Sequence, residues 1–377
     1  MRVLIFGSGQ LARMMYLAGC PLGIEVSAVD VNSQKVVNPV DKHPSPVSLD
    51  QAIEDADAIS VEFEHVPEAL LEKAQRSGKL MPGMEAILTG ADRVREKRLL
   101  ESLGIANCAH RIVDDVEQLD SVVDELGSKL ILKASRDGYD GYGQWRLQHS
   151  DELPGLKQQL AELDLQKVPL VVETMLDFDR EVSLVGVRSQ NGDVRFYDLA
   201  ENLHHQGQLH VSLAPAPQVS DTLWTQAKET FTALADALDY TGVLAVEFFQ
   251  VGEQLLVNEI APRVHNSGHW TMQGADTCQF ENHLRAICDL PLGDTSSHGV
   301  SAMINIIGFA SFSHDMLAIR GCHMHWYGKE VREKRKMGHF NLVGKGYSEL
   351  AASMRALADY LPQRHFPHLV TKAQTLS

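Results

Sequence analysis

Residues 258–270 read Asn258-Glu-Ile-Ala-Pro-Arg-Val-His-Asn-Ser-Gly-His-Trp270, and they follow directly on the apolar run 255–257. The stretch combines a carboxylate, an arginine, two histidines, two asparagines and a serine. Such a mixture does not suit a protein core, because each buried polar group needs a partner. A solvated loop would more often carry Lys, Glu and Ser. We therefore expect a functional site at the end of this strand.

The residues before this stretch predict a hairpin, with strands over 242–250 and 254–260 and a short turn at Gly252. A three-residue loop would place Glu247 opposite Glu259, whereas a two-residue loop would pair Glu247 with Asn258. Two neighbouring carboxylates in apolar strands repel each other unless a cation lies between them. Mg²⁺ commonly binds one or two carboxylates together with substrate phosphates. Glu247 and Glu259 are therefore predicted metal ligands, and the alternative is that one of them faces solvent.

A second informative stretch begins with a short apolar strand over residues 129–133. The strand ends at Lys133 and runs into a loop that contains Gly138, Gly141 and Gly143. The backbone N–H groups of such a loop can converge on a phosphate, and a lysine at the strand end can reach the same group. The chain has no Gly-x4-Gly-Lys-Ser/Thr motif, so this is not a P-loop. An ordinary hairpin turn explains the glycines alone equally well, but the lysine and the distant acidic pair favour a phosphate site.

The N-terminal segment supplies a rival hypothesis. Residues 2–6 predict a strand, Gly7-Ser-Gly9 a tight turn, residues 10–18 a helix, and residues 25–29 a second strand that ends at Asp30. This order fits the Gly-x-Gly-x-x-Ala fingerprint of dinucleotide-binding domains and would make the protein an NAD-dependent dehydrogenase. The fingerprint alone is a weak signal, and the main polar cluster lies far from it in the sequence.

Composition limits the class of protein. The chain has 377 residues, 44% hydrophobic and 22% charged, and a net charge of −16, which argues against a general nucleic-acid-binding protein. No apolar run approaches the roughly 20 residues of a membrane span, and the first residues enter a strand at once, so we expect neither a membrane partner nor a signal peptide. The five scattered cysteines form no Cys-x-x-Cys pair and predict reduced thiols in the cytoplasm. A zinc site at His204-His205 or His323-x-His325 is not expected, because companion ligands are missing.

The length predicts two or three domains. We place them at residues 1–90, 91–290 and 291–377, in a mixed α/β and α+β fold. A strand over 57–61 ends near Glu62 and Glu64, where a ligand crevice and simple surface charge are about equally plausible. Further helices are expected over 91–103, 220–238, 276–288 and 348–361, and further strands over 180–188, 194–198, 301–307, 323–327 and 338–343. Asn191-Gly192 is the strongest hairpin signal in the chain.

These motifs occur in the order found in ATP-grasp enzymes, and within that superfamily the chain resembles the 5-(carboxyamino)imidazole ribonucleotide synthases. The resemblance rests on Gly138-Tyr-Asp-Gly-Tyr-Gly-Gln-Trp145, on the run from Asn258 to Thr271, and on His325-Trp-Tyr-Gly-Lys-Glu-Val-Arg332 with Arg335-Lys-Met-Gly-His339. The segment Gly7–Met14 fits the same family, so the match covers essentially the whole chain. It implies an ATP-grasp fold with an N-terminal Rossmann-like domain and a small C-terminal β-rich domain.

The resemblance also implies an activity. ATP, with Mg²⁺ or with Mn²⁺ in its place, would activate bicarbonate as carboxyphosphate, and 5-aminoimidazole ribonucleotide would be carboxylated to give 5-(carboxyamino)imidazole ribonucleotide, ADP and phosphate in purine biosynthesis. The family suggests a cytoplasmic homodimer. Another ATP-grasp ligase, such as a formate-dependent glycinamide ribonucleotide transformylase or a biotin carboxylase, would share Lys133 and the Glu247–Glu259 pair but should lack the run from Arg263 to Thr271. A non-catalytic ATP-binding protein would tend to lose the acidic pair.

Roles for single residues follow from the resemblance. Catalytic residues would be Asp140 as the base, Arg263 as the bicarbonate ligand, and His265 and Asn266 beside it. Residues for the ribonucleotide would be Gln10, Glu64, Tyr139, Ser267, Lys329, Arg335 and Lys336. Metal ligands would be Glu247 and Glu259. Residues for ATP would be Arg93, Lys133, Gly138, Tyr139, Asp140, Gly141, Tyr142, Gly143, Gln144, Glu173, Thr174, Met175, Leu176, Glu181, His204, Asn258 and Glu259.

The glycine-rich loop departs from the family pattern. Asp137 stands where relatives usually have Gly, and Tyr142 stands where Lys or Arg is common. If the loop closes over the phosphates and excludes water, Gly141→Ala should leave folding near normal but uncouple ATP use from carboxylation.

Overall fold

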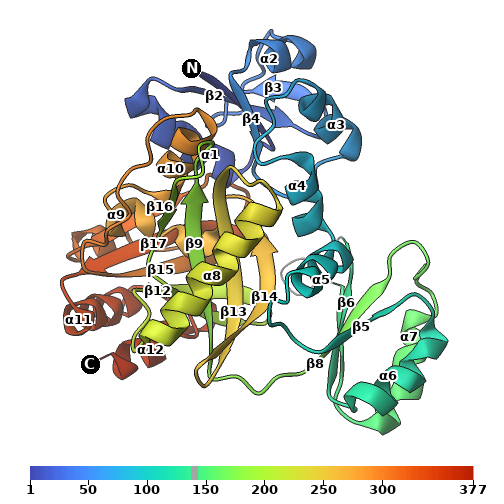
Figure 1. Ribbon diagram of the computed structural model, residues 1–377. Coiled ribbons are helices and arrows are strands. Elements are labelled where there is room, and N and C mark those ends of the chain that lie inside the picture. Colours follow the sequence, from blue (N-terminus) through green and yellow to red (C-terminus); the bar gives the residue numbers. More distant parts are fainter. Residues whose placement is uncertain (137–142, 377) are drawn as a thin grey trace.

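The computed structural model describes residues 1–136 and 143–376, and these form three β-sheets with helices packed around them. Figure 1 shows three lobes: the N-terminal segment at the top, a small sheet with its helices at the lower right, and a large sheet that reaches the C-terminus at the lower left. The predicted glycines Gly138 and Gly141, with their neighbours from Asp137 to Tyr142, lie outside the described residues.

The N-terminal lobe confirms the predicted β-α-β opening. Its sheet has the order β3-β2-β1-β4, with β1 parallel to both β2 and β4. These strands read as continuous apolar runs because helices cover the sheet and bury both of its faces. The elements are β1 (Arg2–Phe6), α1 (Gln10–Gly19), β2 (Glu25–Asp30), β3 (Lys35–Val37), α2 (Leu49–Asp55), β4 (Ala58–Val61), α3 (Glu68–Arg76) and α4 (Met84–Ala91). Helix α4 was not anticipated from the sequence.

The small lobe is an antiparallel sheet of order β5-β8-β6-β7, covered on one side by two helices. Helix α5 (Arg93–Ser102) leads into it from the N-terminal lobe, and Asp92 caps that helix by accepting a hydrogen bond from the Val94 N–H. The other elements are β5 (His110–Val113), α6 (Leu119–Leu126), β6 (Leu130–Ala134), β7 (Gln144–Leu147), α7 (Leu153–Leu160) and β8 (Leu170–Thr174). The predicted strand that carries Lys133 is confirmed as β6.

The large sheet runs in the order β14-β13-β9-β11-β12-β15-β17-β16, and β10 pairs with β9. The elements are β9 (Arg180–Arg188), β10 (Val194–Phe196), β11 (Ala200–His205), β12 (Gln208–Ala214), α8 (Asp221–Ala237), β13 (Gly242–Val251), β14 (Gln254–Ala261), α9 (Thr271–Gly274), α10 (Gln279–Ile287), β15 (Val300–Ile307), β16 (Cys322–Trp326), β17 (Lys336–Gly344), α11 (Tyr347–Ala358) and α12 (Leu369–Thr375). Because β12 pairs directly with β15, the C-terminal strands continue the sheet of the preceding segment. The boundary that we expected near residue 291 therefore does not separate two sheets.

The register of the hairpin β13–β14 combines the two alternatives that the sequence left open. Val251 pairs with Gln254, so the turn has two residues, and this would align Glu247 with Asn258. A β-bulge between Glu247 and Phe248 shifts the register, and Glu247 lies opposite Glu259 instead. Asn258 is the extra residue of the bulge. One inserted residue thus brings the two carboxylates directly across from each other.

The lobes meet where α4 and α5 reach the end of β14. Gly90 lies so close to Pro262 that an added Cβ would be 2.7 Å from the Pro262 Cγ atom. The Val257 N–H donates to the Ala106 carbonyl, and the Ile260 N–H donates to the Glu96 carboxylate. These contacts hold the strand that carries Glu259 against the two smaller lobes.

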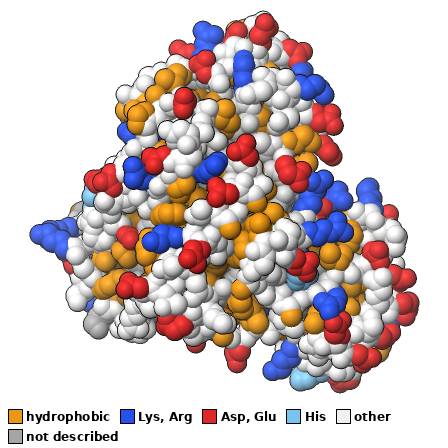
Figure 2. Space-filling model, viewed as in Figure 1, with side chains coloured by type: hydrophobic (Ala, Val, Ile, Leu, Met, Phe, Trp, Pro, Cys, Tyr) orange, Lys and Arg blue, Asp and Glu red, His pale blue; other side chains and the backbone are white. Residues whose placement is uncertain are grey.

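The surface is mixed in charge. Figure 2 shows acidic and basic side chains interspersed over all three lobes on the face that it presents. In the part of the chain that the structure describes, no helix combines the length and the apolar character of a membrane-spanning segment.

Candidate active site

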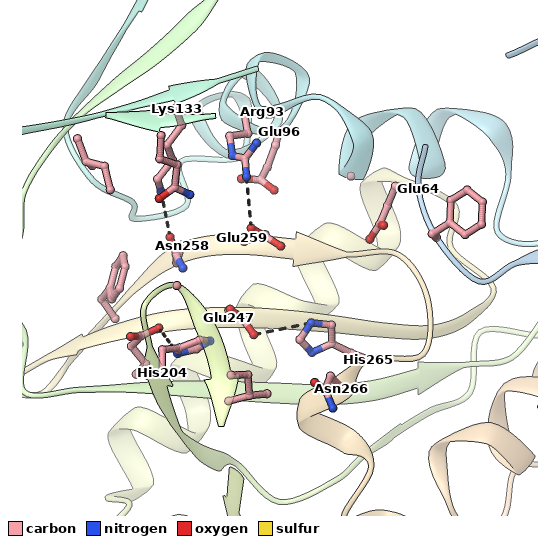
Figure 3. Close-up of a pocket in the computed structure, with 18 of the residues that line it drawn as sticks. Glu64, Arg93, Glu96, Lys133, His204, Glu247, Asn258, Glu259, His265 and Asn266 are labelled. Carbon is pink, nitrogen blue, oxygen red and sulfur yellow. Dashed lines mark hydrogen bonds and ion pairs between the residues drawn. The ribbon is translucent and has the colours of Figure 1, made fainter. Parts of the chain in front are cut away.

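One cavity of about 1080 Å³ lies where the three lobes meet. Figure 3 shows Arg93, Glu96 and Lys133 on one side of it, facing Asn258 and Glu259 on β14. His204, Glu247 and His265 lie below these, on or beside the large sheet. The cavity is lined by most of the side chains that the sequence singled out, namely Gln10, Glu64, Arg93, Lys133, Gln144, Glu173, Thr174, Met175, Leu176, Glu181, His204, Glu247, Asn258, Glu259, Arg263, His265, Asn266 and Lys336.

Four predicted residues do not line the cavity. Ser267 is buried, and its hydroxyl lies 2.9 Å from the His265 Nδ1 atom, so it orients that ring. Lys329 contacts the Gln10 side chain at the edge of the cavity, and Arg335 donates to the Glu330 carbonyl. Gly143 has a positive φ and accepts a hydrogen bond from the Ala134 N–H. Gly138, Tyr139, Asp140, Gly141 and Tyr142 are outside the described residues.

Lys133 belongs to a buried network of two lysines on one carboxylate. The Glu173 Oε2 atom lies 2.5 Å from Lys133 Nζ, and Glu173 Oε1 lies 2.5 Å from Lys97 Nζ. Burial alone would raise the pKa of Glu173, but the two ammonium groups lower it to about 2. Burial alone would lower the pKa of Lys133, but the pair with Glu173 outweighs it and the pKa is raised. Glu173 therefore keeps Lys133 charged and holds its ammonium group beside Asn258. The Lys133 Nζ atom donates a hydrogen bond to Asn258 Oδ1 at 3.4 Å.

The segment from Glu173 to Leu176 was expected to bind adenine through its backbone. The Thr174 N–H donates to the Ala109 carbonyl, and the Met175 N–H donates to the Lys129 carbonyl. These two donors are therefore used within the protein, and a base would have to meet other backbone groups of the segment.

A second cluster joins α5 to β14. The Arg93 guanidinium donates to the Ala134 carbonyl and lies 3.9 Å from the Glu259 carboxylate. Glu96 is 3% exposed, and burial together with the nearby Glu259 raises its pKa to about 7. Because its carboxylate accepts from the Ile260 N–H, Glu96 fixes the backbone beside Glu259. Glu259 itself has a half-exposed side chain that points into the open cavity.

Three cavity side chains come from adjacent strands of the large sheet. The His204 Nδ1 atom lies 3.0 Å from Glu181 Oε2, and the ligand atoms of Glu181, His204 and Glu247 all lie within 4.8 Å of one another. Burial, with Glu259 and Glu181 nearby, raises the pKa of Glu247 to about 7 although His204 opposes the shift. Burial lowers the pKa of His204, but Glu181 and Glu247 outweigh this and the pKa is raised. The region has an excess of negative charge that a cation would relieve.

The residues after β14 form the far wall. Arg263 Nε lies 2.8 Å from Glu64 Oε1, and although burial opposes it, this carboxylate raises the pKa of Arg263. His265 lies 3.8 Å from Glu247, yet burial and the nearby Arg263 hold the pKa of His265 well below its usual value. His265 is therefore a neutral imidazole. Asn266 exchanges hydrogen bonds with the buried Asn305, which fixes its amide.

The glycine fingerprint of the first lobe holds a side chain of the protein. The Glu62 carboxylate accepts hydrogen bonds from the Gly9 and Ala12 N–H groups at the start of α1. An added Cβ at Gly9 would lie 2.8 Å from Glu62 Oε1, so the glycines make room for this carboxylate. A dinucleotide pyrophosphate would have to occupy the same place. The structure therefore argues against the dehydrogenase hypothesis, and Glu62 is a buried part of the fold.

Cations gather beside Glu62. Burial and the charges of Arg335, Lys336 and Lys42 lower the pKa of Lys329 to about 8. A bound anion would offset the repulsion among Lys329, Arg335, Lys336 and Lys42, because it would attract all four side chains. This corner of the cavity therefore suits a phosphate.

Three family models match the chain. They are a ribonucleotide synthetase preATP-grasp domain over residues 1–89, an ATP-grasp domain over residues 98–280, and a phosphoribosylaminoimidazole carboxylase C-terminal domain over residues 301–353. The N5-carboxyaminoimidazole ribonucleotide synthase of Vibrio cholerae is 51% identical over 378 residues, which cover 99% of both chains. The chain belongs to this synthase family. The Escherichia coli synthase is 38% identical over 97% of this chain and 96% of its own.

Solved structures of the synthase family agree with the fold. The enzyme of Thermus thermophilus has a TM-score of 0.84 at 40% identity, covering 95% of this chain and 98% of its own. The Aspergillus clavatus synthase in complex with ADP and 5-aminoimidazole ribonucleotide has a TM-score of 0.83 at 29% identity, covering 95% and 97%. The predicted ATP-grasp fold with its N-terminal and C-terminal domains is confirmed.

Sequence reasoning missed several residues of this synthase site. Glu96 and Lys97 lie on the helix that was expected over 91–103 and received no role from the sequence, yet both are buried. Lys42 is distant in sequence from every motif. Phe178 and Phe249 stack 4.6 Å apart at the cavity wall. No local pattern distinguishes Glu96 and Lys97 from the exposed Arg95 and Arg98 on the same helix.

Proposed function

We propose that this protein catalyses the ATP-dependent carboxylation of 5-aminoimidazole ribonucleotide by bicarbonate, forming N5-carboxyaminoimidazole ribonucleotide, ADP and phosphate in purine biosynthesis. One observation carries the proposal: a single cavity joins the Lys133–Arg93 side and the acidic edge of β14 to Arg263 and to Lys336, whose charge acts on Lys329. The similarity to synthases over the full chain supports the same reaction.

ATP fits between the small lobe and the large sheet. Lys133 and Arg93 would meet its phosphates, the segment that begins at Glu173 its base, and Glu181 its ribose. Glu247 and Glu259 lie directly opposite each other and offer oxygen ligands in a region of excess negative charge, which fits Mg²⁺, and Mn²⁺ would be accepted as a substitute. Held by Glu247 and Glu259, that ion would neutralise negative charge on the transferred phosphoryl group. The protein's own contribution is to position the groups and stabilise their charge.

Bicarbonate would sit beside Arg263, within reach of the γ-phosphate. Its oxygen attacks the γ-phosphorus and ADP leaves, which forms carboxyphosphate. The exocyclic amine of the ribonucleotide then attacks the carboxyl carbon, phosphate leaves, and the amine loses a proton. Asp140 remains our proposed base, although it lies outside the described residues. His265 is neutral and would serve as a hydrogen-bond partner, and Asn266 would hold the carboxyl group from a fixed amide.

The ribonucleotide would bind with its phosphate at Lys329, Arg335 and Lys336, and Lys42, whose charge acts on Lys329, would join them. Gln10 contacts Lys329 and would orient it. Glu64 forms an ion pair with Arg263 in this structure. A bound substrate must therefore either contact Arg263 alongside Glu64 or replace Glu64 as its partner. We also propose that the active form is a cytoplasmic homodimer, and gel filtration of the purified protein tests the oligomeric state.

The deciding experiment measures phosphate release from ATP with Mg²⁺ and bicarbonate, with and without 5-aminoimidazole ribonucleotide. We expect the ribonucleotide to stimulate phosphate release strongly in the wild type and not in Glu259→Gln. The control Glu229→Gln, a matched change at an exposed position of α8, should keep the stimulation. If the folded, ATP-binding protein shows no stimulation, the substrate is wrong. Glycinamide ribonucleotide with formate is then the next assay, since a transformylase would respond to it.

A further inference from the structure

Glu181, His204 and Glu247 form a compact set of metal-ligating side chains that shares Glu247 with the Glu247–Glu259 pair. They stand on the neighbouring strands β9, β11 and β13, because β9 pairs with both of the others. Each offers one ligand atom, and all three atoms lie within 4.8 Å of one another. Among the residues that the structure describes, no other group of three or more His, Cys, Asp or Glu side chains meets this criterion.

The imidazole of His204 has unused bonding capacity. Its Nδ1 atom is buried and lies 3.0 Å from Glu181 Oε2, but the contact is misaligned and Nδ1 has no hydrogen-bond partner among the described residues. The contact with Glu181 completes no hydrogen bond, so this buried nitrogen is incompletely satisfied. The β-bulge between Leu203 and His204 sets the position of this ring relative to β12.

Charge and burial favour a cation here. The side chains of Glu181 and His204 are each 21% exposed, and that of Glu247 is 14% exposed, so water screens their repulsion poorly. The two carboxylates face a single imidazole, so the cluster holds more acidic than basic groups. A divalent ion with bonds of about 2.1 Å would bring its ligand atoms to roughly 3.3 Å apart.

We propose that the nucleotide-free protein binds one divalent transition-metal ion, Mn²⁺ or Zn²⁺, through Glu181, His204 and Glu247. Imidazole suits transition-metal ions, whereas Mg²⁺ prefers oxygen ligands and retains its waters, so this set discriminates against Mg²⁺. The site is distinct from the proposed position of Mg²⁺ with ATP, which uses Glu247 and Glu259. The two positions share Glu247 and cannot both be filled through it.

The site has a consequence for nucleotide binding that rests on the proposed function. Glu181 is the proposed ligand of the ATP ribose, so an ion held by Glu181 competes with the nucleoside. A low concentration of Zn²⁺ that is added before ATP would then inhibit the enzyme. Mg²⁺ at the same concentration would not.

The test titrates the full chain, free of any histidine tag, with MnCl₂ in the absence of nucleotide and records electron spin-echo envelope modulation. We expect one Mn²⁺ per chain with a ¹⁴N coupling from a coordinated imidazole. In His204→Gln the coupling should vanish and the affinity should fall at least about tenfold. The matched control is His205→Gln, because His205 is the exposed neighbour of His204 and should change neither result. Glu181→Gln serves as a second variant if His204→Gln does not fold.

Each outcome is decisive. Folded wild-type protein that binds no Mn²⁺, that binds it without a ¹⁴N coupling, or that keeps the coupling in His204→Gln overturns the proposal. Adenosine, which carries the ribose but no chelating phosphates, should weaken Mn²⁺ binding. If the coupled ion binds but adenosine has no effect, the ion site stands and the role of Glu181 toward ribose fails. If the ribonucleotide does not stimulate phosphate release, the proposed function is refuted but the ion site is not.

Discussion

Glu173→Gln is the change that best tests the buried charge network beneath the cavity. The substitution keeps the shape of the side chain but removes the negative charge that Lys97 and Lys133 share at 2.5 Å each. Lys97 is 2% exposed and cannot move its ammonium group into water without disrupting the lobe, whereas Lys133 is 9% exposed and lines the cavity. Two buried cations would be left without a counter-ion.

The magnitude follows from the pKa of Glu173. A carboxyl pKa lowered from 4.5 to about 2 corresponds to roughly 3 kcal/mol, at about 1.4 kcal/mol for each tenfold change in the equilibrium. Removing one partner of a buried pair typically costs about 3–5 kcal/mol, because the other charge stays buried and unpaired. We therefore expect Glu173→Gln to lower the free energy of unfolding by about 3–5 kcal/mol at pH 7.

The pH dependence has a defined sign. Because the pKa of Glu173 is lower in the folded state, its stabilising contribution is fully present above the unfolded value of 4.5. The contribution is lost as the pH falls from there toward 2. The difference between wild type and Glu173→Gln should therefore be constant near neutrality and shrink below about pH 4.5.

The assay is urea denaturation combined with hydrogen exchange of the peptides that cover β6 and β8, which carry Lys133 and Glu173. The control is Glu85→Gln, which breaks a 3.2 Å ion pair with Arg95 whose side chains are 73% and 44% exposed. Exposed pairs contribute below about 1 kcal/mol. Lys97→Met in the Glu173→Gln background should recover part of the loss, since it removes one unpaired charge. Equal, small effects of Glu173→Gln and Glu85→Gln would refute the reasoning.

Three further predictions concern the cavity. Gly90→Ala should reduce ATP turnover at least about tenfold, because a Cβ there collides with Pro262 and displaces the end of β14, whereas Gly83→Ala, where a Cβ meets nothing within 4 Å, should not; equal turnover of the two variants would contradict this. The kcat/KM for the ribonucleotide should fall as the pH rises through about 8, since the free enzyme then loses the charge on Lys329, and a pH profile of Lys329→Arg should lack this limb. Glu259→Gln should raise the Mg²⁺ concentration needed for half-maximal ATP hydrolysis by about tenfold or more while leaving the thermal unfolding midpoint near wild type, because its side chain is half exposed; an unchanged Mg²⁺ requirement would exclude Glu259 as a ligand.

Local sequence patterns determined most secondary-structure elements and the composition of the site. The alternating and continuous apolar runs, the turn at Gly252 and the Asn191-Gly192 hairpin all predict elements that the structure contains. The run from Asn258 to Trp270 indicated a polar site, because no core or simple loop requires that mixture of groups. Such features depend on residues that are close to one another in the sequence, so they can be predicted from the sequence alone.

The pairing of Glu247 with Glu259 needed the tertiary structure. The turn length pointed to Asn258 as the partner, and a bulge of one residue reversed the outcome. Whether a strand accommodates an extra residue depends on what packs against it, and here Glu96 binds the Ile260 N–H from a distant helix. No local pattern contains that information.

Burial decided the remaining roles. Glu96 and Lys97 look like surface charges in sequence, and Glu62 looks like a candidate ligand residue, but the fold encloses all three. Glu62 then fills the anion position at the start of α1, which removes the dinucleotide site that the glycine pattern suggested. The sequence by itself therefore determined which chemistry the chain could perform and in what order its motifs occur. Only the tertiary structure decided which charges face one another without water between them, because that depends on segments far apart in the chain.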